Sequence, residues 1–166
     1  LELFPRIREV GGLARGSWDA EIIKELQPGP GEPVIDKPRQ SVFWGTDFEE
    51  QLSGLGVDTL IMTGVVTNYC VETAVRDAGD RGYNVILVDD CCAAMSEEHQ
   101  RLALEILNGI YCVVRSTDRV IHDLQTLADA VGTYNRDHPG DVYHWHDLTQ
   151  LKGRYLDEVP LDRVGG

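Results

Sequence analysis

Three short apolar runs, rich in β-branched residues, alternate along the chain with stretches of helical spacing. The runs cover residues 59–63, 84–88 and 111–114, and each is nearly continuous in apolar character, as is typical of strands covered on both faces. Apolar residues at i, i+3 and i+4 spacing form three stripes: Val71, Ala74, Val75 and Ala78; Leu102, Ala103, Ile106 and Leu107; and Val120, Leu124, Leu127, Ala128 and Val131. This alternation predicts a Rossmann-like α/β fold, with a mostly parallel sheet in a three-layer α/β/α arrangement.

The sequence divides into three parts by composition and by the periodicity of its apolar residues. Residues 1–33 are rich in Pro and Gly and predict an irregular segment with one short helix, Trp18 to Leu26. Residues 34–131 predict the α/β core, which begins with a short strand at Val34-Ile35 and a helix from about Thr46 to Ser53. Residues 132–166 lose the periodicity but keep several aromatic residues, so we expect a C-terminal arm docked on the domain or on a neighbouring subunit.

Composition excludes several classes of partner. The net charge of −13 argues against nucleic acid and anionic membranes, because phosphate contacts need clustered Lys and Arg. No apolar run is long enough to span a bilayer. The four cysteines include the adjacent pair Cys91-Cys92 and no CxxC pair, which is a poor disulfide or zinc framework. We therefore expect a cytoplasmic protein.

The segment Gly64 to Glu72 lies where a predicted buried strand ends and a helix begins. Ligands of open parallel sheets bind at the carboxyl ends of the strands. Cys70 is expected in the first helical turn, where free N–H groups and the positive end of the helix dipole favour a thiolate and an oxyanion. A free cysteine is otherwise usually a small buried hydrophobe. We interpret Cys112, inside a strand, and Cys91-Cys92, after one, as packing residues.

Lys37 also follows a predicted strand and is expected on the same edge of the sheet as Cys70. A lysine in that place stabilises a thiolate and a developing oxyanion. A lone lysine at a strand end is more often simply solvated, so this signal is weak on its own.

Several segments together resemble the isochorismatase-like cysteine hydrolases, over roughly residues 16–130. The nucleophile motif of that family resembles TGVVTNYCVETA followed by RDA, and its catalytic-lysine segment resembles KPRQSVF followed by GTD. Further similarity runs from Gly82-Tyr83 through Val88-Asp89-Asp90 to Ser96-Glu97-Glu98-His99. The agreement is best with the branch that acts on N-carbamoyl and ureido compounds.

The resemblance implies a catalytic triad of Asp, Lys and Cys and an isochorismatase-like fold. Cys70 is then the nucleophile that attacks an amide carbonyl and forms a thioester, and Lys37 is the triad lysine. The family also implies a cis peptide bond between Val65 and Val66, with the N–H groups of Val66 and Cys70 forming the oxyanion hole.

The triad aspartate of the family lies on an earlier strand, and we find no matching stretch in this sequence. We therefore expect that one or two N-terminal strands, with the aspartate and any metal site of the family, are missing from this chain. The residues present predict no metal and no cofactor. The resemblance further implies a homo-oligomer, either a tetramer or a dimer.

The resemblance favours a small linear amide as substrate, such as biuret, an N-carbamoyl amine or ureidoacrylate. The expected substrate-binding residues lie beside the lysine and the cysteine: Arg39, Gln40, Phe43, Trp44, Asn68 and Tyr69. Phe43 and Trp44 could equally belong to the core or a subunit interface, Tyr69 could pack against the helix, and Arg39 could be solvated.

Two other functions remain open at this point. The first is another reaction on the same fold: a nicotinamidase-type amidase, or an isochorismatase, which lacks the nucleophilic cysteine and is disfavoured by Cys70. The second is a catalytically silent binding or assembly domain, which has no reason to keep both Cys70 and Lys37.

Overall fold

The computed structural model describes residues 9–137. The chain divides into two compact units, with the boundary between Val34 and Ile35. The boundary lies one residue from the predicted start of the α/β core at residue 34. The predicted C-terminal arm lies outside the described residues, apart from its first positions.

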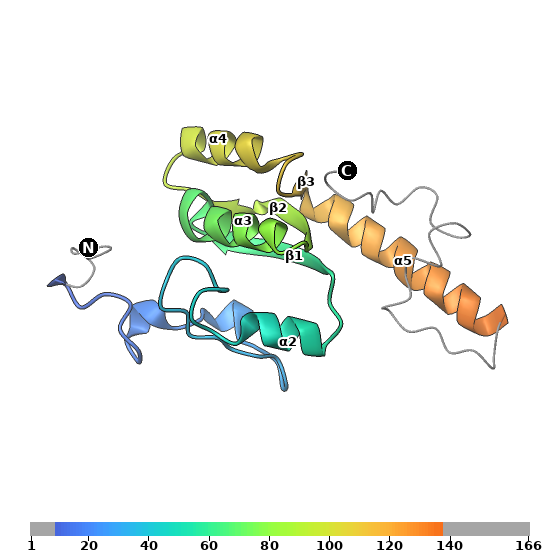
Figure 1. Ribbon diagram of the computed structural model, residues 1–166, viewed down its shortest axis with the longest axis horizontal. Coiled ribbons are helices and arrows are strands. Elements are labelled where there is room, and N and C mark those ends of the chain that lie inside the picture. Colours follow the sequence, from blue (N-terminus) through green and yellow to red (C-terminus); the bar gives the residue numbers. More distant parts are fainter. Residues whose placement is uncertain (1–8, 138–166) are drawn as a thin grey trace. The chain divides into compact units, whose positions relative to one another are not determined.

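A parallel sheet forms the centre of the second unit (Figure 1). Its strands are β1 (Thr59–Val65), β2 (Asn84–Ala93) and β3 (Val113–Arg115), hydrogen-bonded in the order β1-β2-β3. The parallel sheet with flanking helices confirms the predicted fold class. All three strands start within two residues of the predicted runs, but β2 continues five residues farther, to Ala93.

Helices α3 (Glu72–Asp80) and α4 (Glu97–Leu107) are the crossover connections between consecutive strands. They contact each other and therefore lie on the same face of the sheet, while α5 (Thr117–Asp137) follows β3 and contacts β2 (Figure 1). The buried residues of these helices come from the predicted stripes, with Ala130 in addition. Helix α5 ends at Asp137, six residues beyond the last predicted stripe residue.

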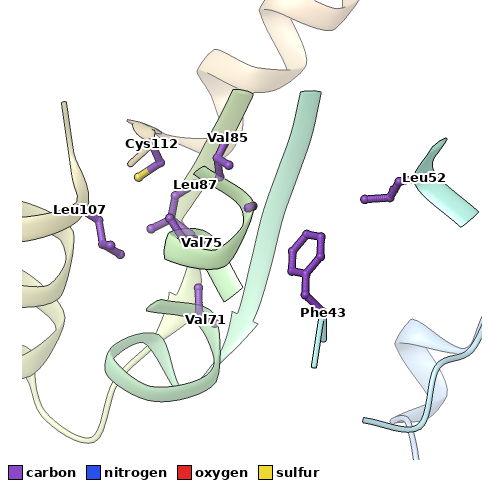
Figure 2. Packing of buried hydrophobic residues seen from close by; sticks show 9 residues of the cluster. Phe43, Leu52, Val71, Val75, Val85, Leu87, Leu107 and Cys112 are labelled. Carbon is purple, nitrogen blue, oxygen red and sulfur yellow. The ribbon is translucent and has the colours of Figure 1, made fainter. Parts of the chain in front are cut away.

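The core is a cluster of apolar side chains between the sheet, α3, α4 and the loop before α2 (Phe48–Gly54). Val75 of α3 and Leu87 of β2 lie close together in its centre, and both are completely buried (Figure 2). The cluster consists of Phe43, Leu52, Val71, Val75, Ala78, Val85, Leu87, Leu107 and Cys112. Burial of this apolar surface holds α3 against the strand end that carries the candidate site.

The pairing of β1 with β2 is interrupted near the carboxyl end of β1. Met62 pairs with Leu87 and Gly64 pairs with Cys92, so five residue steps on β2 match two on β1. The sequence interpretation placed Cys91 and Cys92 after the strand, which is wrong: both belong to β2. Cys91 is also exposed rather than packed, whereas Cys92 is half-buried and Cys112 is fully buried just before β3.

Asp90, in this irregular part of β2, binds the start of α5. Its Oδ1 accepts hydrogen bonds from the backbone N–H and the hydroxyl of Thr117, both at 2.8 Å. The Thr117 hydroxyl, and then its backbone N–H, lower the pKa of the Asp90 carboxyl. The contact therefore ties the end of β2 to α5 more strongly when Asp90 is ionised.

Replacing Asp90 with Asn is expected to make the free energy of unfolding depend less on pH in the acidic range. Because the pKa is lower in the folded state, the contribution of Asp90 is present above the unfolded pKa of about 3.9 and is lost as the pH falls through the folded value. Urea midpoints should therefore differ most between wild type and Asp90→Asn near pH 7, and the difference should shrink toward pH 3. Asp80→Asn, at the exposed end of α3, is the control. A constant Asp90→Asn difference across this range would contradict the prediction.

The first unit contains two short 3-10 turns, η1 (Trp18–Ala20) and η2 (Lys24–Leu26), instead of the predicted helix from Trp18 to Leu26. Glu21 and Ile23 adopt extended backbone conformations between the two turns. Neither turn buries a residue, so no packed face stabilises a continuous helix, and so short a helix is marginal alone.

The predicted strand at Val34-Ile35 is also wrong. These residues are irregular, and among residues 9–137 they pair with no strand. A strand needs a hydrogen-bonded neighbour, and apolar character alone does not provide one. The predicted helix after Thr46 is confirmed as α2, with Asp47 at its N-cap.

Candidate active site

The backbone at the carboxyl end of β1 has two unusual features in succession. Gly64 has φ of +122°, and the Val65–Val66 peptide bond is cis, at the position that the family resemblance implied. A Cβ on Gly64 would meet Val71 at 3.9 Å, an ordinary contact. The positive φ angle is therefore the reason that glycine is favoured here, since residues with a Cβ atom rarely adopt it. This turn directs the chain from β1 into the segment that contains Cys70.

Cys70 lies in a π-helical turn, η3 (Thr67–Val71), which leads directly into α3. The prediction that Cys70 occupies the first turn of the α-helix was therefore wrong in detail, since α3 begins at Glu72. The Val66 carbonyl accepts hydrogen bonds from the N–H groups of Tyr69 (3.0 Å) and Val71 (3.3 Å), which close the turn. Single π-helical turns are frequent at functional sites. Cys70 has a free, partly exposed thiol.

Two buried polar atoms lie in the same turn. Thr67 is completely buried and its Oγ1 has no hydrogen-bond partner, and Oδ1 of Asn68 is also buried without a partner, both within the described part of the chain. An unsatisfied buried polar group costs about 1–3 kcal/mol, so such groups are uncommon outside functional or ligand-binding positions. The sequence interpretation named Asn68 but missed Thr67, because nothing in the sequence indicates that a single threonine in a turn is buried.

Lys37 lies in the loop before α2, not at the end of a strand. Its side chain is exposed, and its Nζ donates to the Arg39 carbonyl at 3.1 Å. Within residues 9–137, no hydrogen bond or ion pair joins it to Cys70. The pairing of Lys37 and Cys70 in one catalytic site therefore remains a prediction.

The loop that carries Lys37 is nevertheless attached to the helix that follows Cys70. Oε1 of Gln40 lies 3.2 Å from the hydroxyl of Thr73, which also donates to the Tyr69 carbonyl at 2.7 Å. Phe43 anchors the same loop in the core, in an edge-to-face contact with Phe48 at 5.1 Å between ring centroids. These contacts place residues 40–43 beside the start of α3.

The predicted substrate-binding residues separate into two groups. Phe43 is a core residue, one of the alternatives left open by the sequence, and its burial removes it from the proposed substrate contacts. Trp44 and Tyr69 are exposed, and the Arg39 guanidinium lies 4.9 Å from the centroid of the Trp44 ring. Arg39 also donates to the Pro38 carbonyl at 2.9 Å. Arg39, Gln40, Trp44, Asn68 and Tyr69 keep their predicted roles as proposals.

Two of the other three thiols are disfavoured as nucleophiles by their surroundings. Burial raises the pKa of Cys112 to about 12, and burial also raises the pKa of Cys92. Since the thiolate is the reactive form, both groups remain protonated near neutral pH. Cys91 is exposed, and its Sγ lies 3.1 Å from Oγ1 of Thr117 at the start of α5.

The structure thus combines a parallel α/β sheet with a free cysteine in the turn that follows its first strand. Residues 3–119 match the isochorismatase domain, and the chain belongs to the isochorismatase family.

Similar proteins include both enzymes and solved structures. The chain is 43% identical over 93 residues to the ureidoacrylate amidohydrolase RutB of Methylobacterium radiotolerans, covering 55% of this chain and 36% of that protein. A cysteine hydrolase from Pseudomonas syringae pv. phaseolicola superposes with a TM-score of 0.67 at 35% identity, covering 72% of this chain and 60% of that one. The N-carbamoylsarcosine amidase from Thermoplasma acidophilum gives a TM-score of 0.60 at 30% identity, with coverage of 69% and 65%.

The matches cover only part of the relatives. The chain spans between 36% and 46% of the length of three ureidoacrylate amidohydrolases that it resembles. No helix within residues 9–137 combines the length and the apolar character that a membrane crossing needs.

Proposed function

We propose that the protein is a cysteine-dependent amidohydrolase that cleaves a C–N bond of a small linear amide. The observation that carries the proposal is the position of Cys70. It lies in a π-helical turn that follows the carboxyl end of a parallel strand, in a chain of the isochorismatase family. Similarity to proteins named as amidohydrolases supports the reaction class.

In the proposed reaction the Cys70 thiolate attacks the amide carbonyl carbon. The oxygen of the tetrahedral intermediate is stabilised by the backbone N–H groups of Val66 and Cys70, and the positive charge of Lys37 favours both thiolate and oxyanion. The C–N bond then breaks, the nitrogen takes up a proton and leaves as ammonia or an amine, and a thioester remains on Cys70. Water hydrolyses the thioester to a carboxylic or carbamic acid and regenerates the thiol.

The proton transfers require a general acid–base group. The family resemblance assigns this role to an aspartate on an earlier strand, and we assign it to no aspartate of this chain.

The proposed substrates are carbamoyl and ureido compounds. The support is the similarity to ureidoacrylate amidohydrolases and to an N-carbamoylsarcosine amidase. Polar and aromatic groups of the loop before α2 are suited to such a substrate, since exposed Arg39 and half-buried Gln40 offer hydrogen bonds to carbonyl and amide groups and exposed Trp44 offers an apolar wall.

A substrate panel tests this proposal. Ammonia release by the full-length protein should be fastest with ureidoacrylate, biuret or N-carbamoylsarcosine and at least about tenfold slower with nicotinamide, which corresponds to about 1.4 kcal/mol in transition-state binding. Faster turnover of nicotinamide would replace the proposed substrate class. Turnover of none of the four would favour a catalytically silent domain.

We further propose that the protein is a cytoplasmic homo-oligomer, a dimer or a tetramer. Exposed apolar residues on the outer side of α4, Leu102 and Ile106, support an interface there. A monomer in sedimentation velocity at micromolar concentration would contradict the oligomer, and fractionation of cells would test the compartment.

A further inference from the structure

The irregular part of β2 lies directly beside the strand end that carries the candidate nucleophile. Between the pairs Met62–Leu87 and Gly64–Cys92, β2 advances five residues while β1 advances two. Extra residues in one strand cannot all form ladder hydrogen bonds, so their backbone groups need other partners. Residues 88–91, called here the β2 bulge, are therefore a place where a side chain can determine the backbone conformation.

Gln100 of α4 supplies such a partner within the β2 bulge and another directly after it. Its Nε2 lies 3.3 Å from the Asp89 carbonyl oxygen and 3.3 Å from the Cys92 carbonyl oxygen, and it donates to both. A side-chain amide has two N–H groups, so one glutamine can satisfy both carbonyls together. Its Oε1 is buried and has no partner within residues 9–137, so this orientation of Gln100 leaves one polar atom unsatisfied.

The far end of the β2 bulge is attached to the turn before Cys70. Cys92 pairs with Gly64 and Ala93 pairs with Val65. The Gly64 backbone N–H also acts on the Cys92 thiol, where it partly opposes the rise in pKa that burial causes. The backbone held by Gln100 is thus the neighbour of the residues that precede the cis peptide bond.

We infer that Gln100 is a positioning residue of the candidate active site. It fixes the β2 bulge, the bulge fixes Gly64 and Val65, and these set the direction of the Val66 N–H and of the turn containing Cys70. This inference rests on the proposed function, because Val66 and Cys70 matter only if the site performs amide hydrolysis. Displacement of a catalytic group by about 1 Å can cost about a hundredfold in rate, so a residue outside the site can have a large effect.

Two variants of Gln100 and one matched control test the inference in the full-length protein. Gln100→Ala removes both donors, and Gln100→Glu places an ionised acceptor opposite two carbonyl oxygens. Gln125→Glu, on an exposed position of α5, is the control for the same chemical change. We expect kcat to fall about tenfold in Gln100→Ala and further in Gln100→Glu, with KM within about twofold of wild type and the control unchanged.

The pH dependence separates positioning from a merely structural role. A protonated glutamate has one O–H donor, so kcat of Gln100→Glu relative to wild type should rise as the pH is lowered from 8 to 5. If Gln100→Ala lowers the unfolding midpoint but leaves kcat unchanged, the inference is overturned. If Gln100→Glu does not fold, Gln100→Ala alone decides between these results.

A second readout does not depend on catalytic turnover. The rate of alkylation of Cys70 by iodoacetamide, measured on the peptide that contains it, should fall several-fold in Gln100→Ala and stay unchanged in Gln125→Glu. If wild type hydrolyses none of the panel amides but the alkylation of Cys70 still depends on Gln100, the proposed function fails and the positioning of Cys70 stands. An unchanged alkylation rate together with unchanged kcat contradicts the positioning role.

Discussion

Cys70→Ala should reduce amide hydrolysis by about a thousandfold or more while leaving the fold intact. The partly exposed thiol lies in the η3 turn and is outside the core cluster, so its removal should create no cavity. Without the thiol no thioester can form. The remaining rate should reflect only binding and oxyanion stabilisation. Initial rates of ammonia release, normalised to folded protein by circular dichroism, measure the effect.

Cys112→Ala provides the matched control for this experiment. This variant makes the same chemical change, loss of a thiol, at a cysteine that is buried in the core and whose pKa is raised to about 12. We expect this variant to lose stability through the cavity that it leaves and to keep its turnover per folded molecule. The assignment of Cys70 would be wrong if Cys70→Ala turned over amide at the wild-type rate, or if Cys112→Ala were the inactive variant.

Leu87→Ala should lower the free energy of unfolding by about 3 kcal/mol, within the range of about 2–5 kcal/mol for buried leucines. Leu87 is 0% exposed, lies in the middle of β2 and packs in the same cluster as Val75 of α3 (Figure 2). The truncation removes apolar burial and leaves a cavity between the sheet and the helix that follows Cys70. Urea unfolding monitored by circular dichroism measures the change.

Leu55→Ala is the control for Leu87→Ala, because Leu55 is 72% exposed at the end of α2. Its truncation should change the free energy of unfolding by no more than about 0.5 kcal/mol, as is usual for surface substitutions. Equal effects of the two leucine substitutions would contradict the description of the core.

The spacing of apolar residues predicted the helices that pack against the sheet. The predicted stripe of α3 is largely buried, whereas those of α4 and α5 are buried only in part: Ala103 and Leu127 are buried, but Leu102, Ile106 and Leu124 are exposed. The same reasoning failed for residues 18–26, where no residue of the two short turns is buried and so no packing stabilises a helix. It also failed for Val34-Ile35, where an apolar pair has no neighbouring strand.

The details of the site depend on contacts that periodicity cannot describe. The β2 bulge is a difference in length between two paired strands, and it becomes visible only once the register of β1 against β2 is known. The burial of Thr67 and the contact of Gln100 with two carbonyls likewise depend on how α4 approaches the strand ends. Cys70 and Lys37 were first singled out by their positions after predicted strands and then by family resemblance. The cis Val65–Val66 bond was expected from the resemblance alone, and the structure contains it at the expected place.

Quenched-flow mass spectrometry gives the most direct test of Cys70 as the nucleophile. Samples acid-quenched within the first turnovers of the best panel substrate should contain protein carrying the acyl part of that substrate. The added mass should lie on the peptide that contains Cys70, and hydroxylamine should remove it, as expected of a thioester. Turnover of the substrate with no adduct on Cys70, or an adduct that persists in Cys70→Ala, would contradict the account.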